Sequence, residues 1–190
     1  MNKAYWEERY QNNDTGWDTG EITTPLKEYI DQIKNKDLKI LIPGAGNGYE
    51  FDYLIENDFS NVTVIDIAKQ PIEALKKKNP KHIANFIQGD FFELNKTFDL
   101  IIEQTFFCAL NPEMRSRYAT KMYSLLKEKG KIAGLLFDFP LTEVGPPFGG
   151  SKEEYLILFS QKFNIKKLER AYNSIKPRKD KELFFIFEKK

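Results

Sequence analysis

The sequence predicts a single α/β domain with a mostly parallel, seven-stranded sheet, helices on both faces and an antiparallel hairpin at one edge. Three observations lead to this prediction. Short β-prone segments alternate with longer helical segments along the chain. The strand segments are largely continuous apolar runs, which is typical of strands buried on both faces. The chain has 190 residues, enough for one domain with a sizeable core.

The strands are expected where short apolar runs are bounded by glycine, proline or polar residues. In chain order they cover residues 38–43, 61–66, 84–88, 98–103, 131–137, 163–172 and 182–188. The first strand ends in a glycine-rich turn, and the fifth follows a turn at Gly130. The last two strands flank a basic turn at 176–181, so they form the expected hairpin.

Six helices are expected between and around these strands. They cover residues 4–11, 25–34, 49–56, 70–78, 112–126 and 152–160. Pro25 suits a first helical turn, where the amide hydrogen that proline lacks has no partner in any case. A polar loop at 12–24 and a loop rich in proline and glycine at 140–150 complete the chain.

Charge and cysteine content limit the classes of function. The chain has 29 Lys and Arg against 28 Asp and Glu, so it lacks the overall positive charge that is usual in nucleic-acid-binding proteins. Its single cysteine, Cys108, cannot form an intrachain disulfide, which fits a reducing compartment. No apolar run approaches the roughly 20 residues that span a bilayer, and residues 1–10 do not read as a signal peptide. We therefore expect a cytoplasmic protein with no membrane or nucleic-acid partner.

The strongest local motif is the glycine-rich turn after the first strand. Gly44, Gly46 and Gly48 lie between a strand and a helix, where glycine permits a tight turn and lets backbone amides approach a ligand. Asp66 ends the second strand, 18 residues after Gly48, and its carboxylate can accept hydrogen bonds from ribose hydroxyls. Together these features favour a ligand that contains a nucleoside over a purely structural turn.

A third element follows the third strand. Asp90 can accept a hydrogen bond from an adenine amino group, although Asp is also common there as a helix cap. Asp90 and Phe91 would lie at the carboxyl edge of the sheet, where open α/β sheets bind ligands. The glycine spacing differs from the G-x-G-x-x-G pattern of NAD sites. The three elements together resemble a class I, Rossmann-like methyltransferase, which implies S-adenosylmethionine as cofactor and S-adenosylhomocysteine as product.

Two longer stretches narrow the resemblance. YWEERYQNNDTGWDTGEITTP, at residues 5–25, resembles the opening of the thiopurine methyltransferase-like superfamily. FDLIIEQTFFCALNPEMRSRYATKMYSLLKEKGKI, at 98–132, and FPLTEVGPPF, at 139–148, are similar to the thiol/halide ("harmless to ozone layer") methyltransferases. This similarity runs from about residue 6 to 148. It implies an N-terminal lid segment at 1–35, a cofactor-binding core at 36–137, and an acceptor loop, helix and terminal hairpin at 138–190.

The resemblance also implies site residues. The cofactor is expected to contact Trp6, Tyr10, Trp17, Gly44, Gly46, Gly48, Asp66, Asp90, Phe91 and Gln104, and the acceptor pocket to contain Phe106, Phe107 and Phe148. The family generally has Trp in place of Tyr10, Tyr in place of Gln104, and Tyr in place of Phe148. All three positions are expected near the cofactor or the acceptor, so these departures bear on the choice of acceptor.

The predicted chemistry needs no catalytic acid or base. The leaving group of a sulfonium is activated by its own charge, so the protein must chiefly position the reactants and exclude water. Aromatic rings suit this purpose because a ring face attracts a sulfonium methyl. His82, the only histidine, is expected to face solvent, and Cys108 to be a buried small hydrophobe. No group of residues has metal-ligand spacing.

The predicted function is therefore methyl transfer from S-adenosylmethionine to a small thiol, bisulfide, halide or pseudohalide. A thiopurine-type enzyme for larger aromatic thiols and a cofactor-binding protein without turnover remain alternatives, with a nicotinamide oxidoreductase as a distant fourth. An amine or nucleic-acid acceptor is disfavoured because 103–106 reads EQTF, without the Pro-Pro-aromatic motif of many N-methyltransferases. We expect a monomer or weak homodimer.

Overall fold

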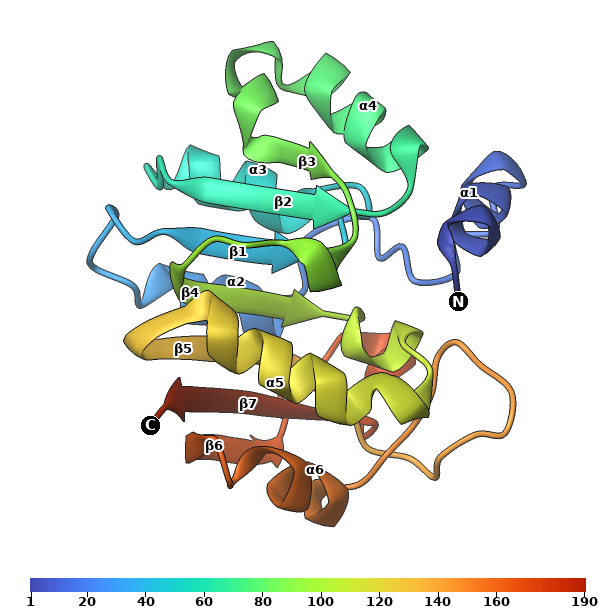
Figure 1. Cartoon of the computed structure of the whole chain (residues 1–190), viewed down its shortest axis with the longest axis vertical. Helices are drawn as coiled ribbons and strands as arrows, with labels where there is room; N and C mark the ends of the chain where they lie inside the picture. The colour runs from blue at the N-terminus through green and yellow to red at the C-terminus, as the bar shows by residue number, and fades with distance from the viewer.

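A computed structural model describes residues 1–190 and confirms the predicted fold class (Figure 1). Its seven-stranded sheet has the order β3-β2-β1-β4-β5-β7-β6, in which β7 is antiparallel to both neighbours and the other neighbouring pairs are parallel. The strands are β1 (Ile40–Pro43), β2 (Val62–Asp66), β3 (Phe86–Gln88), β4 (Phe98–Gln104), β5 (Leu126–Phe137), β6 (Phe163–Arg170) and β7 (Glu182–Lys189). The closing hairpin is confirmed, with β7 inserted between β5 and the edge strand β6.

The six expected helices are present, together with short 3-10 turns. The helices are α1 (Lys3–Gln11), α2 (Thr24–Asp31), α3 (Tyr49–Glu56), α4 (Lys69–Lys78), α5 (Arg115–Leu125) and α6 (Lys152–Phe159). The 3-10 turns are η1 (Pro80–Asn85), η2 (Phe91–Glu93), η3 (Phe107–Ala109), η4 (Pro112–Met114) and η5 (Lys176–Arg178). None of these helices has the length and apolar character needed to cross a bilayer.

Two hydrophobic cores hold the helices against the two faces of the sheet. On one face, α2, α3 and α4 cover the parallel strands with side chains such as Ile30, Phe51 and Leu75. On the other face, α5 and α6 pack against β4, β5 and β7 through side chains such as Tyr118 and Phe159. Continuous burial of β1 and of most of β4 explains why these strands lack an alternating pattern.

The structure differs from the sequence-based prediction at the start of β5. This strand begins at Leu126 rather than at residue 131, and the expected turn at Gly130 is an irregularity within it. A Cβ atom on Gly130 would lie 2.8 Å from the carbonyl oxygen of Lys127, so only glycine fits this tight backbone. The expected helix at 112–126 is likewise divided into η4 and α5.

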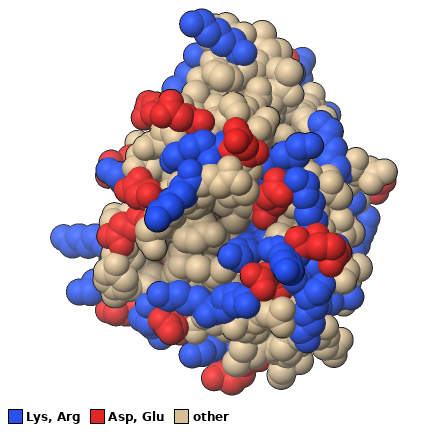
Figure 2. All heavy atoms as spheres, turned by 90° about the vertical axis from the view of Figure 1, so that its left-hand side faces the viewer, with Lys and Arg blue, Asp and Glu red and all other residues tan.

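The carboxyl ends of the parallel strands share one edge of the sheet, and α1 and the loop at 138–150 lie beside it (Figure 1). The opposite edge carries Lys and Arg interspersed with Asp and Glu, without a field of one sign (Figure 2). Ligand sites of open α/β sheets lie at the carboxyl ends of the strands, so the functional site is expected at this edge.

Candidate active site

A cavity of about 610 Å³ opens at the carboxyl ends of the strands. Ten of the thirteen predicted site residues line it: Trp6, Tyr10, Trp17, Gly44, Gly46, Asp66, Asp90, Phe91, Gln104 and Phe106. These residues come from the N-terminal segment, the glycine loop, and the ends of β2, β3 and β4. The fold therefore brings together side chains that are up to about a hundred positions apart in the sequence.

The glycine loop and Asp66 form one backbone-lined wall of the cavity. Gly44, Gly46 and Gly48 all have positive φ angles, of 81°, 49° and 74°, which only glycine adopts without strain. The Asp66 carboxylate accepts hydrogen bonds from the amides of Ala45 and Ala68, both at 2.8 Å. Burial raises the pKa of Asp66, and these amides oppose that shift. Each carboxylate oxygen keeps a lone pair that can accept a hydroxyl from a ligand.

Asp90 has a structural role as well as a place in the cavity. Its Oδ1 atom accepts a hydrogen bond of 2.8 Å from the amide of Phe92 and so caps η2. The cap is the structural role expected of an Asp at a helix start, and it fixes the side chain at the cavity edge. Phe91 beside it is buried and packs against Phe106, with ring centroids 5.1 Å apart.

Three aromatic rings of the N-terminal segment cover the cavity. The ring of Trp17 packs edge-to-face against Trp6 and Tyr10, with centroid separations of 5.6 and 5.5 Å. The Arg9 guanidinium lies 5.4 Å from the Trp17 ring. The pKa of the Tyr10 hydroxyl is raised by its burial and by the nearby Asp66 carboxylate. This ring cluster can shield a bound cation from water.

Asp18 fastens the N-terminal segment to the glycine loop. Its carboxylate accepts hydrogen bonds from the Asn47 side chain at 2.6 Å and from the Tyr49 hydroxyl at 2.9 Å. Asn47 belongs to the loop itself and Tyr49 begins α3. Through these bonds the segment closes over the loop rather than extending into solvent.

Three predicted site residues do not line the cavity. A Cβ atom on Gly48 would lie 2.3 Å from Leu75, so this glycine permits close packing of α3 against α4. Phe107 is 1% exposed and packs against Tyr118 in the core below the sheet edge. Phe148 is also buried, and its amide donates a hydrogen bond of 2.8 Å to the carbonyl of Cys108.

The opposite wall of the cavity is mainly apolar. It includes Phe106, Cys108, Phe137, Pro146 and Pro147. Cys108 is buried as predicted, its thiol donates to the Thr105 carbonyl at 3.3 Å, and burial raises its pKa. A thiol with a raised pKa is a poor nucleophile at neutral pH. His82 lies elsewhere, half-buried against Phe51 rather than fully facing solvent.

Glu103 lies just beneath this wall and is fully buried. Its Oε1 atom accepts hydrogen bonds from the amides of Phe106 and Phe107, at 2.7 and 2.8 Å, whereas Oε2 has no partner. Burial raises the pKa of Glu103 to about 7, and the negative charge of the Glu182 carboxylate adds a smaller upward shift. The side chain thus holds the turn that presents Phe106 to the cavity.

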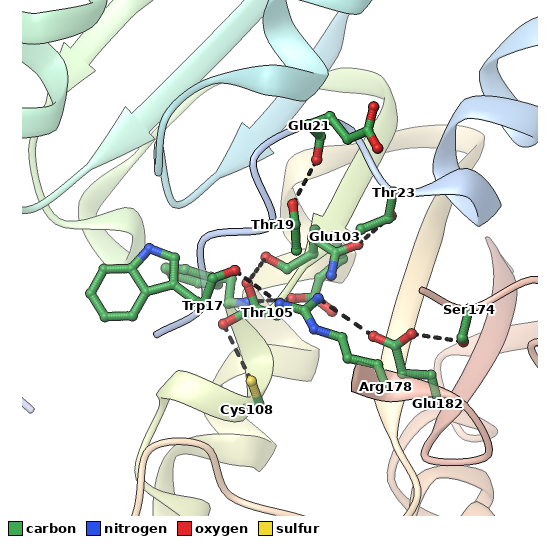
Figure 3. A network of polar contacts seen from close by, with 12 residues as sticks. Trp17, Thr19, Glu21, Thr23, Glu103, Thr105, Cys108, Ser174, Arg178 and Glu182 are labelled. Carbon is green, nitrogen blue, oxygen red and sulfur yellow. Dashed lines mark hydrogen bonds and ion pairs between the residues drawn. The ribbon is translucent and has the colours of Figure 1, made fainter. Parts of the chain in front are cut away.

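Arg178 joins the two sides of the site (Figure 3). It is 8% exposed and lines the cavity. Its Nη2 atom donates to the carbonyl of Trp17 at 2.9 Å, and Nη1 lies 3.5 Å from a Glu182 oxygen. Nη1 makes no hydrogen bond, and the Ser174 hydroxyl donates to the second Glu182 oxygen. The guanidinium is therefore anchored, with one donor group free.

Sequence analysis did not identify Arg178 or Asp18 as site residues. Arg178 belongs to a turn with three lysines, which read as a solvated basic segment, and no local signal separates it from them. The sequence does mark Glu103 as unusual, because a glutamate directly after the strand segment FDLII is rare in a buried strand.

Comparisons with known proteins identify the family of the chain. Residues 1–190 match the thiopurine S-methyltransferase family. The chain belongs to this family. It is 34% identical over 157 residues to probable thiol methyltransferase 2 of Arabidopsis thaliana, covering 79% of this chain and 69% of the relative. It is 30% identical over 184 residues to thiocyanate methyltransferase 1 of Brassica oleracea, covering 93% and 81%.

A solved structure shows the same fold. The 1,6-didemethyltoxoflavin-N1-methyltransferase of Burkholderia thailandensis, solved with 1,6-didemethyltoxoflavin and S-adenosylhomocysteine, superposes with a TM-score of 0.77. It is 16% identical, and the match covers 98% of this chain and 86% of that one. As a member of the thiopurine S-methyltransferase family, the chain is a methyltransferase with S-adenosylmethionine as cofactor, as predicted.

The cavity residues fit this cofactor. The volume of about 610 Å³ lies within the usual range of about 300–1,000 Å³ for small-molecule sites. Asp66 and Asp90 offer acceptors for hydroxyl and amino groups, and the glycine loop leaves backbone free to approach a ligand, since a Cβ on Gly46 would meet nothing within 4 Å. The ring cluster of Trp6, Tyr10 and Trp17 suits a sulfonium.

Proposed function

We propose that this enzyme methylates a small sulfur or halide nucleophile: a thiol, bisulfide, thiocyanate or halide. The observation that carries the proposal is the Arg178 guanidinium, nine-tenths buried beside an apolar wall, whose Nη1 atom lies 3.5 Å from a Glu182 oxygen and makes no hydrogen bond. A buried cation with a free donor suits a compact anion, because an unpaired buried donor is costly. The names of the plant relatives, a thiol and a thiocyanate methyltransferase, support the same class of acceptor.

The cofactor is proposed to lie against the β1–β2–β3 half of the sheet edge. In this proposal Asp66 accepts hydrogen bonds from the ribose hydroxyls and Asp90 accepts one from the adenine amino group, with Phe91 beside the base; all three residues line the cavity. The backbone of Gly44 and Gly46 bounds the site on one side, and Trp6, Tyr10 and Trp17 cover it. The Asp18 bonds to Asn47 and Tyr49 hold this cover in place before ligands bind.

The chain's contribution to the reaction is positioning and exclusion of water. When bound, S-adenosylmethionine supplies a methyl group whose transfer is promoted by the positive charge on its sulfur. Phe106, Phe137 and the two prolines of the 138–150 loop remove water from the acceptor side, which strengthens electrostatic attraction there. Arg178 holds the anion, and no general base is needed for acceptors that arrive ionised.

A larger aromatic thiol is the second candidate, because the matching family bears the name of thiopurine S-methylation. It differs from the first in what the acceptor side must hold. A purine ring system would rely on stacking against Phe106 and Phe137, whereas a compact anion would rely on Arg178.

The experiment is headspace gas chromatography of the protein with S-adenosylmethionine and, separately, iodide, thiocyanate, bisulfide and a small thiol. We expect volatile methylated products above a no-enzyme control. Arg178→Gln should raise the KM for thiocyanate about tenfold. Arg170→Gln is the control for loss of a nearby positive charge, since this arginine is half-exposed on β6, lies outside the cavity lining, and binds Asp138 and the carbonyl of Asp180. No product from any acceptor, with cofactor binding intact, would overturn the proposal.

A further inference from the structure

The carboxamide of Gln104 is an unusual feature of the cavity. Gln104 is the last residue of β4, at the centre of the sheet edge, and lines the cavity. Its Oε1 atom accepts a hydrogen bond of 3.0 Å from the Thr23 hydroxyl. Its Nε2 atom has no partner and almost no contact with solvent. One end of the amide is therefore fixed, and the other is an unsatisfied donor.

The Thr23 hydroxyl donates to the Gln104 carboxamide instead of capping a helix. Thr23 occupies the N-cap position of α2, where a threonine side chain ordinarily accepts a backbone amide. Here its side chain makes no capping bond, and Pro25 at the second position of the helix has no N–H to offer. Thr23 is 1% exposed, so its hydroxyl can reach few other partners. The arrangement turns the Nε2 end of Gln104 away from Thr23.

The position of Gln104 in the sheet indicates which ligand the donor serves. Gly44, Asp66 and Asp90 follow β1, β2 and β3, which form one half of the sheet edge. Gln104 ends β4, the first strand of the other half, and the next strand, β5, ends at Phe137. Phe137 in turn lies 5.8 Å from the Arg178 guanidinium. The free donor therefore lies on the strand next to the residues proposed for the acceptor side, whereas the family resemblance alone placed Gln104 among the cofactor contacts.

We propose that Gln104 determines acceptor specificity by donating a hydrogen bond from Nε2 to the anionic acceptor. This inference rests on the proposed function and adds a second donor to the site. A buried N–H without a partner is rare in proteins, and a ligand atom that accepts the bond removes the penalty. Sulfur anions, thiocyanate and halides all accept hydrogen bonds, whereas a thioether product does so only weakly. The donor thus binds the reactant more strongly than the product.

The test measures anion binding and cofactor binding separately. Thiocyanate is titrated by calorimetry into the protein saturated with S-adenosylhomocysteine, and S-adenosylhomocysteine is titrated into the free protein. Gln104→Leu should weaken thiocyanate binding about tenfold or more because leucine has no donor, and Gln104→Glu should do so at pH values where the glutamate is ionised and can only accept. Both should leave the affinity for S-adenosylhomocysteine within about twofold of wild type.

Thr23 supplies a matched pair of variants that leaves the carboxamide in place. Thr23→Val removes the hydroxyl that orients the amide, and it should weaken thiocyanate binding by a smaller factor than Gln104→Leu. Thr23→Ser keeps the hydroxyl and should restore wild-type binding. Thermal unfolding of each variant checks that the protein remains folded.

Each outcome decides between assignments. Unchanged thiocyanate binding in Gln104→Leu, with weakened S-adenosylhomocysteine binding, would assign the donor to the cofactor and overturn the inference. If wild-type protein neither binds nor methylates small anions, the proposed function fails first. If wild type does both and Gln104→Leu matches it, the proposed function stands and only the role of Gln104 is lost.

Discussion

Replacing Glu103 with glutamine should change how the stability of the protein depends on pH. The Glu103 side chain is fully buried, and its pKa rises from 4.5 to about 7 because burial penalises the charged form. Between these two pH values the folded state holds a proton that the unfolded state has released. The free energy of unfolding must therefore fall as the pH rises through this window.

The magnitude follows from the size of the window. The interval from 4.5 to about 7 is about 2.5 pH units, and at about 1.4 kcal/mol per unit it corresponds to about 3 kcal/mol. Glutamine is uncharged at every pH, and its carbonyl can still accept the two amides of Phe106 and Phe107 that Glu103 binds. Glu103→Gln should therefore lose this part of the pH dependence while keeping the turn.

The assay is urea unfolding of wild type and Glu103→Gln at intervals from pH 5 to pH 8. Comparing the two proteins at each pH cancels the contributions of buried carboxyls that do not interact with Glu103, such as Asp66, whose pKa burial also raises. We expect the variant to gain stability relative to wild type by up to about 3 kcal/mol between the two ends of the range. A difference that stays constant across the range would refute the reasoning.

Three further variants test separate parts of the structure. Gly134→Ala should lower the free energy of unfolding by about 3 kcal/mol, because the added Cβ would lie 2.1 Å from a backbone oxygen of β4. Gly16→Ala is the control, since a Cβ there would meet nothing within 4 Å. Equal urea midpoints for the two variants would contradict the prediction. Asp18→Ala should weaken S-adenosylhomocysteine binding about tenfold, because it removes the hydrogen bond that holds the N-terminal segment to Asn47. Calorimetry measures the affinity, and a wild-type value would contradict the prediction. Asp66→Ala should weaken the same binding by about 1–3 kcal/mol, and an unchanged dissociation constant would rule out its proposed role.

The cofactor side of the site was predictable because it depends on local signals. A glycine loop after a buried strand and an aspartate at the next strand end must meet at the carboxyl edge of a parallel sheet. The structure accordingly places Gly44, Gly46 and Asp66 in one cavity. The strand order was not predicted, because the alternation of strands and helices indicates only that the parallel strands are joined by crossovers.

The acceptor side was less predictable because it depends on side-chain direction and on distant segments. Phe106 and Phe107 are adjacent in an apolar run, yet one lines the cavity and the other is buried beneath it, as the short turn η3 decides. Phe148 is turned into the protein by its bond to Cys108. Arg178 reaches the cavity only because η5 packs beside Trp17, which is 161 residues away in the chain.

In the proposed function, the ends of β1, β2 and β3 hold the cofactor, and the ends of β4 and β5 hold the acceptor. On the proposed function, selectivity arises from anion binding beside the buried Arg178, in a pocket that excludes water, rather than from acid–base catalysis. Of the three departures from the family, only Tyr10 and Gln104 line the cavity, so these two are expected to alter acceptor preference, with Gln104 providing a donor of its own.

The most direct test of the central claim is a comparison of kcat/KM for thiocyanate, bisulfide and a purine thiol. The rate of S-adenosylhomocysteine formation is measured for all three acceptors with the same wild-type protein. Binding of the acceptor by a buried cation predicts that at least one small anion exceeds the purine thiol by about tenfold or more. A purine thiol that is turned over faster than both anions would contradict the account.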